Sequence, residues 1–468
     1  MPGASTPKTQ ADLLVRGGTI VDETGERRAD VLVSEGRVVA VEPSIEAPRG
    51  ATVLDAGGCF VSPGLVDLHA HLREPGGEIA ETVESGSRAG ALGGYTALVA
   101  MPNTEPAIDS AAVARDVLAL GQKAVTEIAV AGAVTVGRRG ERLSPMGELA
   151  ELGVRIFTDD GSGVQNGGLM RRALEYASGL GVVLAEHCED VQLAAGGQMH
   201  EGAWSSRLGI AGQPALAEEV MLSRDLALVA LTGTPMHFLH LSTAGSVEMV
   251  RAAKAAGLPV TAEVTPHHLA LSDAVLQGYD PVFKVKPPLR GVADVTALRA
   301  GLTSGVIDAI ATDHAPHAPE RKEEPFDEAP SGMLGLETAL AVAYGALCLA
   351  PGQSDEQADS GWVPPGPGPG VPLGELFGWF SWKPARIAGL YEEAEGPLGR
   401  RGGQGGPINP GALAHLCVFD PSATWVVDPA AQASRSHNTA WAGRSLTGKV
   451  RHSVLAGEVV VLDGKAQR

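Results

Sequence analysis

Two histidines separated by a single residue, His69 and His71, end an apolar segment in the first fifth of the chain. Side chains on a strand alternate between its two faces, so both imidazoles would project to the same side. Two imidazoles at the end of a buried strand suit a transition metal. The pair is a weak motif by itself, because two ordinary histidines would give the same pattern.

Further candidate ligands follow apolar segments elsewhere in the chain: Asp160, His187, His240 and Asp313. If these segments are parallel strands of a barrel, their carboxyl ends meet at one face. Four imidazoles and two carboxylates exceed what one four-coordinate zinc needs. They suffice for two metals that share a bridging carboxylate, so these residues predict a binuclear metal site.

Eight segments with the composition of buried strands could position these ligands. They span residues 65–69, 96–101, 127–133, 154–158, 182–186, 237–241, 260–264 and 307–311, and Ala/Leu-rich stretches typical of helices separate most of them. Eight such units in roughly 250 residues are typical of a (β/α)₈ barrel. We favour the barrel over a doubly wound open sheet because the candidate ligands all follow strand ends.

Short β-rich segments joined by turns occur at both ends of the chain, at 13–21, 30–33 and 37–41 and again at 414–419, 449–455 and 459–462. Neither end is long enough to close a core alone, and chain termini often lie close together. We therefore expect both ends to pair into one small β domain. The predicted division is 1–62, barrel 63–404 and 405–468, and a Pro/Gly-rich insertion at 351–372 is expected to be a surface loop.

Composition narrows the class of protein. The 468 residues allow a barrel with an accessory domain. A formal net charge of −19 argues against a nucleic-acid partner, because phosphate binding needs clustered Lys and Arg. The cysteines form no C-x-x-C pair, no apolar run reaches the ~20 residues that span a bilayer, and residues 1–10 do not look like a signal peptide. We expect a cytoplasmic protein without a membrane partner.

Several segments closely resemble the signature motifs of the dihydroorotases, binuclear zinc cyclic-amide hydrolases of the amidohydrolase superfamily. These segments are DLHAHLREPG (67–76), MPNT (101–104), TAEVTPHH (261–268), ATDHAPH (311–317) and GLET (335–338). The likeness runs from about residue 13 to about residue 463, apart from the insertion. It implies a (β/α)₈ TIM barrel with a composite β-sandwich domain. It also implies reversible hydrolysis of dihydroorotate to N-carbamoyl-L-aspartate in de novo pyrimidine (UMP) biosynthesis.

Carried over to matching positions, the resemblance implies two Zn²⁺ per subunit, bridged by Asp160. The implied ligands are His69, His71, Asp160, His187, His240 and Asp313. Some relatives use a carboxylated lysine as the bridge, but FTDDG (157–161) contains none, so an aspartate must serve. Asp160 is favoured over Asp159, with the register open by one residue. The implied mechanism is attack by a metal-bridging hydroxide with Asp313 as the proton shuttle.

The implied substrate contacts are Arg73, Asn103, Lys286, His317, Ser331 and Gly332. Arg73, Asn103 and His317 would hold the substrate carboxylate, and an arginine can do so with two parallel hydrogen bonds. Lys286, in FKVKPPLR (283–290), stands where dihydroorotases usually have an asparagine that contacts the substrate ring. Three outcomes are open. Lys286 could point inward and pair with the anionic substrate, it could repel the metals and shift specificity, or it could turn outward to solvent.

Two other functions stay open at this stage. One is an allantoinase or hydantoinase, which Arg73 disfavours because a neutral ring does not need that cation. The other is a non-catalytic dihydroorotase-like scaffold subunit for aspartate transcarbamoylase, which need not retain metal ligands. By resemblance alone, a homodimer or a complex with aspartate transcarbamoylase is expected, besides the small-molecule substrate. The polar loop 314–335 is either a lid over the site or a solvated charged loop.

Overall fold

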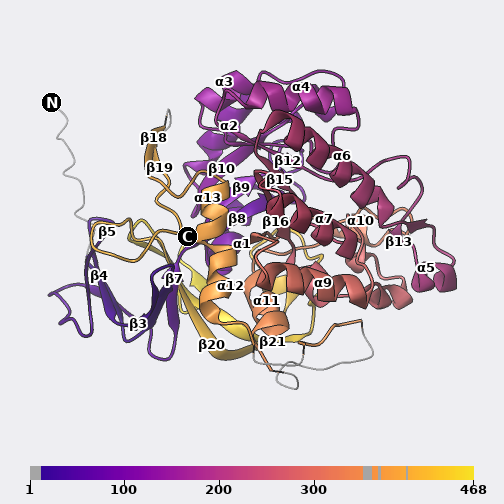
Figure 1. Cartoon of the computed structure of the whole chain (residues 1–468). Coiled ribbons are helices and arrows are strands. Elements are labelled where there is room, and N and C mark those ends of the chain that lie inside the picture. The colour runs from indigo at the N-terminus through magenta and orange to yellow at the C-terminus, as the bar shows by residue number, and fades with distance from the viewer. Residues whose placement is uncertain (1–11, 351–360, 367–369, 397–398) are drawn as a thin grey trace.

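The computed structural model describes residues 12–350, 361–366, 370–396 and 399–468 (Figure 1). Eight parallel strands form its central sheet: β8 (Leu65–Ala70), β9 (Tyr95–Ala100), β10 (Glu127–Gly132), β11 (Ile156–Phe157), β12 (Val183–Glu186), β15 (Met236–Phe238), β16 (Val260–Val264) and β17 (Ala309–Ile310). The strands are hydrogen-bonded in the order β17-β16-β15-β12-β11-β10-β9-β8. A parallel bridge from His314, beyond β17, to Ala70 of β8 brings the two edges together. The predicted (β/α)₈ barrel is confirmed.

Two strands, β11 and β17, are shorter than the segments predicted for them. Single backbone hydrogen bonds continue the ladder beyond their ends, such as Thr158 N to Gly132 O at 2.8 Å and Ala311 N to Val264 O at 3.1 Å. The carboxyl ends of these strands are therefore held in place even where regular pairing stops.

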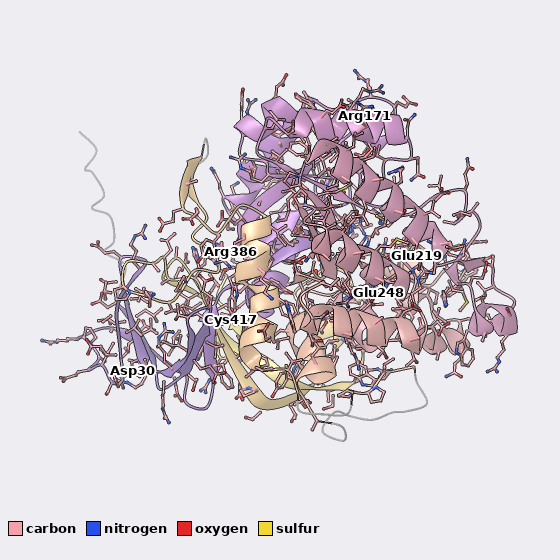
Figure 2. All side chains as sticks on the ribbon, viewed as in Figure 1. Asp30, Arg171, Glu219, Glu248, Arg386 and Cys417 are labelled. Atoms are coloured by element: carbon pink, nitrogen blue, oxygen red, sulfur yellow. The ribbon has the colours of Figure 1, made fainter. Side chains whose placement is uncertain are left out.

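Helices surround the strands (Figure 1). They are α1 (Val83–Leu92), α2 (Ala111–Gly121), α3 (Met146–Glu151), α4 (Gly167–Ala177), α6 (Leu216–Thr232), α7 (Ala244–Ala255), α9 (Val292–Thr303), α11 (Ala339–Leu347), α12 (Leu373–Phe380) and α13 (Trp382–Ile387). The N-cap side chains Thr82, Asn166 and Thr243 each accept a hydrogen bond from the backbone N–H three residues further on. Charged side chains such as Arg171 and Glu248 stand on the outer helices (Figure 2).

The two ends of the chain form two further sheets beside the barrel. Their strands are β1 (Leu13–Arg16), β2 (Thr19–Asp22), β3 (Gly25–Arg28), β4 (Asp30–Ser34), β5 (Arg37–Glu42), β6 (Thr52–Asp55), β7 (Phe60–Pro63), β20 (Leu416–Val426), β21 (Ser445–Leu455), β22 (Glu458–Leu462) and β23 (Lys465–Ala466). One sheet has the order β5-β4-β1-β6, and the other has the order β23-β22-β21-β20-β7-β2-β3. Strand β20 pairs with β7, so N-terminal and C-terminal strands share one sheet (Figure 1).

An apolar core joins these two sheets, as expected for a composite β-sandwich. Leu13, Val31, Ile20, Leu416 and Val454 belong to this core and are each at most 2 % exposed. The first two come from the N-terminal sheet and the others from the mixed sheet. Burial of such aliphatic side chains stabilises the domain by roughly 25 cal/mol per Å² of apolar surface.

Smaller elements connect or flank these strands and helices. They are β13 (Met199–His200), α5 (Ala203–Leu208), β14 (Gly212–Gln213), α8 (Pro266–Ala270), α10 (Pro319–Lys322), the 3₁₀ helices at Val136–Arg138, Asp273–Gly278, Pro281–Phe283 and Pro429–Ala431, and the hairpin β18 (Ala394–Gly396) with β19 (Gly399–Arg401). No helix in the described ranges is both long and apolar enough to cross a membrane. The cysteines are free thiols.

The insertion 351–372 is not entirely a surface loop. Residues 351–360 and 367–369 lie outside the described ranges, but Trp362 and Val363 are buried. The Trp362 ring packs edge-on against Trp441 at 5.5 Å between centroids, and Val363 N donates to Ala270 O at 2.8 Å. The aromatic side chain lets part of a Pro/Gly-rich segment dock onto the barrel.

The loop 314–335 is bonded to the rest of the protein, while Glu320, Arg321 and Glu323 of its charged tip are exposed, as expected of a solvated loop. The buried ammonium of Lys322 donates to the carbonyl oxygens of Pro281 at 2.9 Å and Pro330 at 2.7 Å. In return, Lys284 Nζ donates to Phe326 O at 2.7 Å. Two buried lysines thus tie this loop to the segment after β16.

Candidate metal centre

Asp160 lies at the middle of the predicted ligand set. Its Oδ1 is 3.4 Å from His69 Nε2, 3.6 Å from His187 Nδ1 and 3.5 Å from His240 Nε2, and its Oδ2 is 3.5 Å from His71 Nε2. All five side chains are buried. They form two groups, each able to hold a cation, that have Asp160 in common.

The neighbouring Asp159 points elsewhere. Its Oδ1 accepts a hydrogen bond from Thr135 N at 3.0 Å, and its Oδ2 contacts the Thr135 hydroxyl. Asp160 thus faces the imidazoles, and Asp159 is bonded to the loop after β10.

Asp313 completes the group from the end of β17. Its Oδ1 is 3.0 Å from His71 Nε2 and 3.6 Å from His69 Nε2. Asp313 and His240 adopt left-handed backbone conformations, with φ of 45° and 30°. Residues other than glycine rarely adopt such values. Such strain is concentrated at functional sites, where the surrounding structure holds it in place.

The carboxylates of this centre are ionised. Burial alone would raise the pKa of Asp313, but the hydrogen bond with His71 and the charges of His69 and His240 hold that pKa well below its ordinary value. Burial likewise opposes ionisation of Asp160, and the surrounding imidazoles more than offset it and lower its pKa. Ionised carboxylates beside imidazole nitrogens give the centre donor groups of the kind that bind divalent cations.

The donor atoms fit a divalent transition metal. His69 Nε2 is buried, has no hydrogen-bond partner among the described residues and faces Asp160. His187 Nδ1 and His240 Nε2 face each other at 2.9 Å, beside the same carboxylate. Imidazole nitrogens and carboxylate oxygens are the ligands that zinc and similar metals prefer.

Two outer residues fix the orientation of the first histidine pair. Glu263 Oε1 accepts a hydrogen bond from His69 Nδ1 at 3.0 Å, and Asn103 Oδ1 accepts one from His71 Nδ1 at 2.8 Å. Each bond places the proton on the outer nitrogen and leaves the inner lone pair toward the centre. Asn103 Nδ2 also donates to Asp160 Oδ2 at 3.3 Å, so Asn103 orients metal-facing groups as well as bordering the site.

Sequence reasoning assigned no role to Glu263 or Arg138. Glu263 is a fully buried acid on a mostly apolar strand, and an acid in such a strand was the signal that the sequence offered. Arg138, which donates to the backbone oxygen of Asp160 at 2.9 Å, sits in an irregular loop and gives no such signal.

The predicted carboxylate-binding residues lie together on one side of the centre. Arg73 Nε donates to Pro316 O at 3.1 Å, next to His317. Burial lowers the pKa of Arg73 to about 10, so the guanidinium stays charged at neutral pH. Burial and the nearby Arg73 lower the pKa of His317 to about 3, so this imidazole is neutral.

The backbones of Ser331 and Gly332 form hydrogen bonds within the protein. Ser331 O accepts a hydrogen bond from His317 Nε2 at 2.8 Å, and Gly332 N donates to Lys284 O at 2.8 Å. A Cβ at Gly332 would lie 2.6 Å from Ala315 Cβ, and the residue has φ of 134°, so only glycine fits there. Their role as substrate contacts stays a prediction.

Lys286 adopts neither orientation expected for it. Its Nζ forms an ion pair with Glu189 Oε1 at 2.8 Å and lies 3.5 Å from Gly161 O. The side chain is 39 % exposed, so it lies at the rim and bridges two loops of the site.

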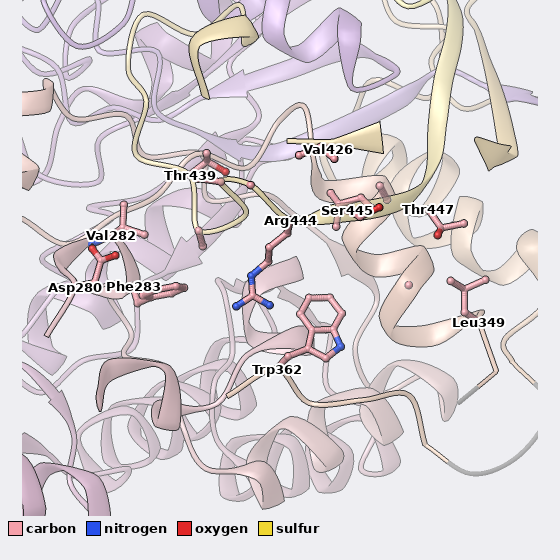
Figure 3. Close-up of a pocket in the computed structure, with 16 residues that line it drawn as sticks. Asp280, Val282, Phe283, Leu349, Trp362, Val426, Thr439, Arg444, Ser445 and Thr447 are labelled. Carbon is pink, nitrogen blue, oxygen red and sulfur yellow. The ribbon is translucent and has the colours of Figure 1, made fainter. Parts of the chain in front are cut away.

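A separate cavity of about 440 Å³ lies between the barrel and the C-terminal segment. Figure 3 shows Arg444 reaching toward Phe283 and Trp362 within it. None of the predicted metal ligands lines this cavity, so it is distinct from the metal centre.

Comparisons with known proteins agree with this geometry. A family model described as "Dihydro-orotase-like" matches residues 58–246. The chain is 44% identical to a dihydroorotase of Pelotomaculum thermopropionicum over 453 residues, which cover 96% of this chain and 99% of that protein. It is also 44% identical to a dihydroorotase of Mycobacterium tuberculosis, over 97% of this chain and 99% of that one.

Solved structures of similar fold include an L-hydantoinase (dihydropyrimidinase) from Arthrobacter aurescens, with a TM-score of 0.80 and 24% identity over 98% of each chain. A D-hydantoinase (dihydropyrimidinase) from Thermus sp. has a TM-score of 0.77 and 24% identity, over 97% of this chain and 96% of that one. At this identity the likeness shows a shared fold only.

Proposed function

The chain belongs to the dihydroorotase family, and from this membership we propose that it catalyses the reversible hydrolysis of dihydroorotate to N-carbamoyl-L-aspartate. The observation that carries the proposal is the placement of Asp160, whose oxygens lie 3.4–3.6 Å from four buried imidazole nitrogens. Such a ligand set suits amide hydrolysis assisted by metals.

We propose two Zn²⁺ ions per subunit, held by the six predicted ligands with Asp160 shared between them. His69, His71 and Asp160 make one group, Asp160, His187 and His240 make the other, and Asp313 borders the first. When bound, the cations polarise the amide carbonyl and make water acidic enough to attack near neutral pH.

Asp313 is the residue best placed to move protons. In the hydrolysis, the water oxygen bonds to the ring carbonyl carbon and the carbon–nitrogen bond breaks. One water proton passes to the leaving nitrogen, and the other is released as the new carboxyl group ionises. An ionised Asp313 can accept the first proton and return it to nitrogen, as a general base and then a general acid.

Recognition of the substrate carboxylate falls to Arg73, with Asn103 and neutral His317 beside it. A buried guanidinium is a strong partner for a carboxylate, since charge-assisted hydrogen bonds are about twice as strong as neutral ones. Arg73 therefore favours dihydroorotate, which carries a carboxylate, over the neutral rings of hydantoin and allantoin.

We further propose that the protein works in the cytoplasm, in de novo pyrimidine biosynthesis. A homodimer or a complex with aspartate transcarbamoylase is part of the same proposal, as is the division of the chain at residues 62 and 404. The family membership supports these points.

Proton NMR of zinc-reconstituted protein tests the reaction. With dihydroorotate as the only substrate, N-carbamoyl-aspartate should appear, and the same final ratio should be reached from either compound. Conversion of hydantoin or allantoin in place of dihydroorotate would refute the proposed substrate.

A further inference from the structure

Glu189 is a buried carboxylate next to the metal centre that the mechanism above does not use. Glu189 is 4 % exposed. Oε1 pairs with Lys286 Nζ at 2.8 Å, and Oε2 accepts a hydrogen bond from Gln213 Nε2 at 3.0 Å. Oε2 also lies 3.8 Å from His187 Nε2, on the outer side of that ring. A buried carboxylate is costly unless it is paired, and here Lys286 and Gln213 pair it.

The ring nitrogen of His187 that points away from the centre lacks, within the described part of the chain, the hydrogen bond that the corresponding nitrogens of His69 and His71 make. Its Nδ1 faces the centre, 3.6 Å from Asp160 Oδ1. Its Nε2 is buried and has no hydrogen-bond partner among the described residues. The outer nitrogens of His69 and His71, by contrast, are bonded to Glu263 and Asn103.

Metal binding at Nδ1 would leave a buried N–H at His187 Nε2 without an acceptor among the residues that the structure describes. When His187 gives the Nδ1 lone pair to a cation, the neutral ring carries its proton on Nε2. A buried N–H without an acceptor costs about 1–3 kcal/mol. Glu189 Oε2 is a carboxylate oxygen 3.8 Å from that nitrogen, and closing this distance to a hydrogen bond requires a shift of about 0.8 Å.

We propose that Glu189 accepts the outer N–H of His187 in the metal-bound protein, and that Lys286 holds the Glu189 carboxylate in that position. Both are positioning residues: Glu189 acts through His187, and Lys286 acts through Glu189. Lys286 then serves the metal centre in a position where dihydroorotases usually have asparagine, and its charge is not available to the substrate. The inference rests on the proposed metal centre and deepens it.

Metal affinity, measured without substrate, tests the inference. Apoprotein is titrated with Zn²⁺ in competition with a chromophoric chelator, and with Co²⁺ while the visible spectrum is recorded. Glu189→Gln should weaken Zn²⁺ binding by about 10- to 100-fold, as is typical when the outer partner of a ligand is lost, and should change the Co²⁺ spectrum. Glu189→Asp, which keeps the charge but shortens the reach, should act in the same direction.

A double-mutant cycle isolates the role of Lys286. Lys286→Met should weaken Zn²⁺ binding by a smaller factor in the native background and have no effect beside Glu189→Gln. Lys383→Met is the matched control, since Lys383 is 34 % exposed and lies 3.8 Å from Glu375 on α12. It should leave metal affinity unchanged. Lys286→Met leaves the buried Glu189 carboxylate without its ion pair and should lower the melting temperature of the apoprotein, so Zn²⁺ affinity measured on folded apoprotein is the readout that a purely structural role would not change.

Unchanged Zn²⁺ affinity in both Glu189 variants would overturn the proposal. An increase in affinity on Lys286→Met, equal in both backgrounds, would overturn the role of Lys286, because it would show direct repulsion of the metals. If metal binding behaves as expected but dihydroorotate is not hydrolysed, the proposed function fails and this inference stands.

Discussion

The metal-facing nitrogens of His69 and His71 are set by contacts on the far side of each ring. His69 is held by Glu263 and His71 by Asn103, and Asn103 also donates to Asp160 Oδ2. Such outer partners fix the tautomer and the direction of the lone pair. At the residue scale, the centre is therefore preorganised by pairs of side chains that lie far apart in the sequence.

The role of Asp313 gives a direct prediction. Asp313→Asn should lower the turnover of dihydroorotate by about 10²–10⁴-fold, because positioned proton transfer contributes that much. Metal content, measured by elemental analysis, should be retained. Asp308→Asn is the control, since Asp308 pairs with Lys254 at 2.6 Å and touches no predicted ligand. Near-normal turnover of the Asp313 variant would remove the proton shuttle from the mechanism.

The role of Arg73 in binding the substrate carboxylate is tested by the KM of the enzyme for dihydroorotate. A hydrogen bond to a charged group is worth about 1.5–3 kcal/mol, so Arg73→Met should raise KM for dihydroorotate by roughly 10- to 100-fold. The exposed Arg171 on α4 provides the control variant Arg171→Met, which should leave KM unchanged. Steady-state kinetics would contradict the assignment if KM stayed the same in both variants.

Residue types predicted the inner ligands but not the contacts that hold them. His187, His240 and Asp313 could be picked out because each comes within three residues of the end of an apolar strand. The ion pair of Lys286 with Glu189 joins loops almost a hundred residues apart and has no local pattern. A lysine is solvated in most loops, so a paired position at the rim was not among the expected states.

At the scale of elements, the loops after the barrel strands are joined by a residue from the C-terminal segment. Asn438, which is buried, donates through Nδ2 to Ala315 O at 3.0 Å and Gly332 O at 3.1 Å. Its Oδ1 accepts from His317 N at 3.2 Å. The segment between β20 and β21 thus holds the loop that carries the predicted substrate contacts.

Removing the Asn438 amide should disturb both folding and substrate binding. Asn438→Leu leaves two buried carbonyls and one buried N–H unpaired, and each such group costs about 1–3 kcal/mol. We expect a lower free energy of unfolding in denaturant titrations and a higher KM for dihydroorotate. Asn409→Leu, at an exposed position of the C-terminal segment, should change neither. Equal KM for the Asn438 variant and the native protein would show that the loop holds itself.

The elements themselves were largely predictable, and their irregular connections were not. Apolar runs bounded by turns identify all eight barrel strands, because buried parallel strands have no polar face. The docking of Trp362 and the burial of Lys322 depend on partners in other elements. Composition predicts a surface position for such segments, and the tertiary contacts override it.

At the scale of the molecule, the two chain ends and the barrel are one interdependent structure. Strand β7 leads directly into β8, which carries His69, and β7 also pairs with β20 from the other end of the chain. The composite domain therefore supports the first barrel strand from below the site. The pairing was predictable because neither end can bury its apolar residues alone.

The central claim is that dihydroorotate is hydrolysed at a two-metal centre bridged by Asp160. The most direct measurement is kcat/KM for dihydroorotate as apoprotein is titrated with Zn²⁺, with bound zinc determined in the same samples. We expect negligible activity without zinc and full activity at two bound ions per chain. Asp160→Asn should be inactive and Asp159→Asn should still be active. Full activity at one ion per chain, or in the Asp160→Asn variant, would contradict it.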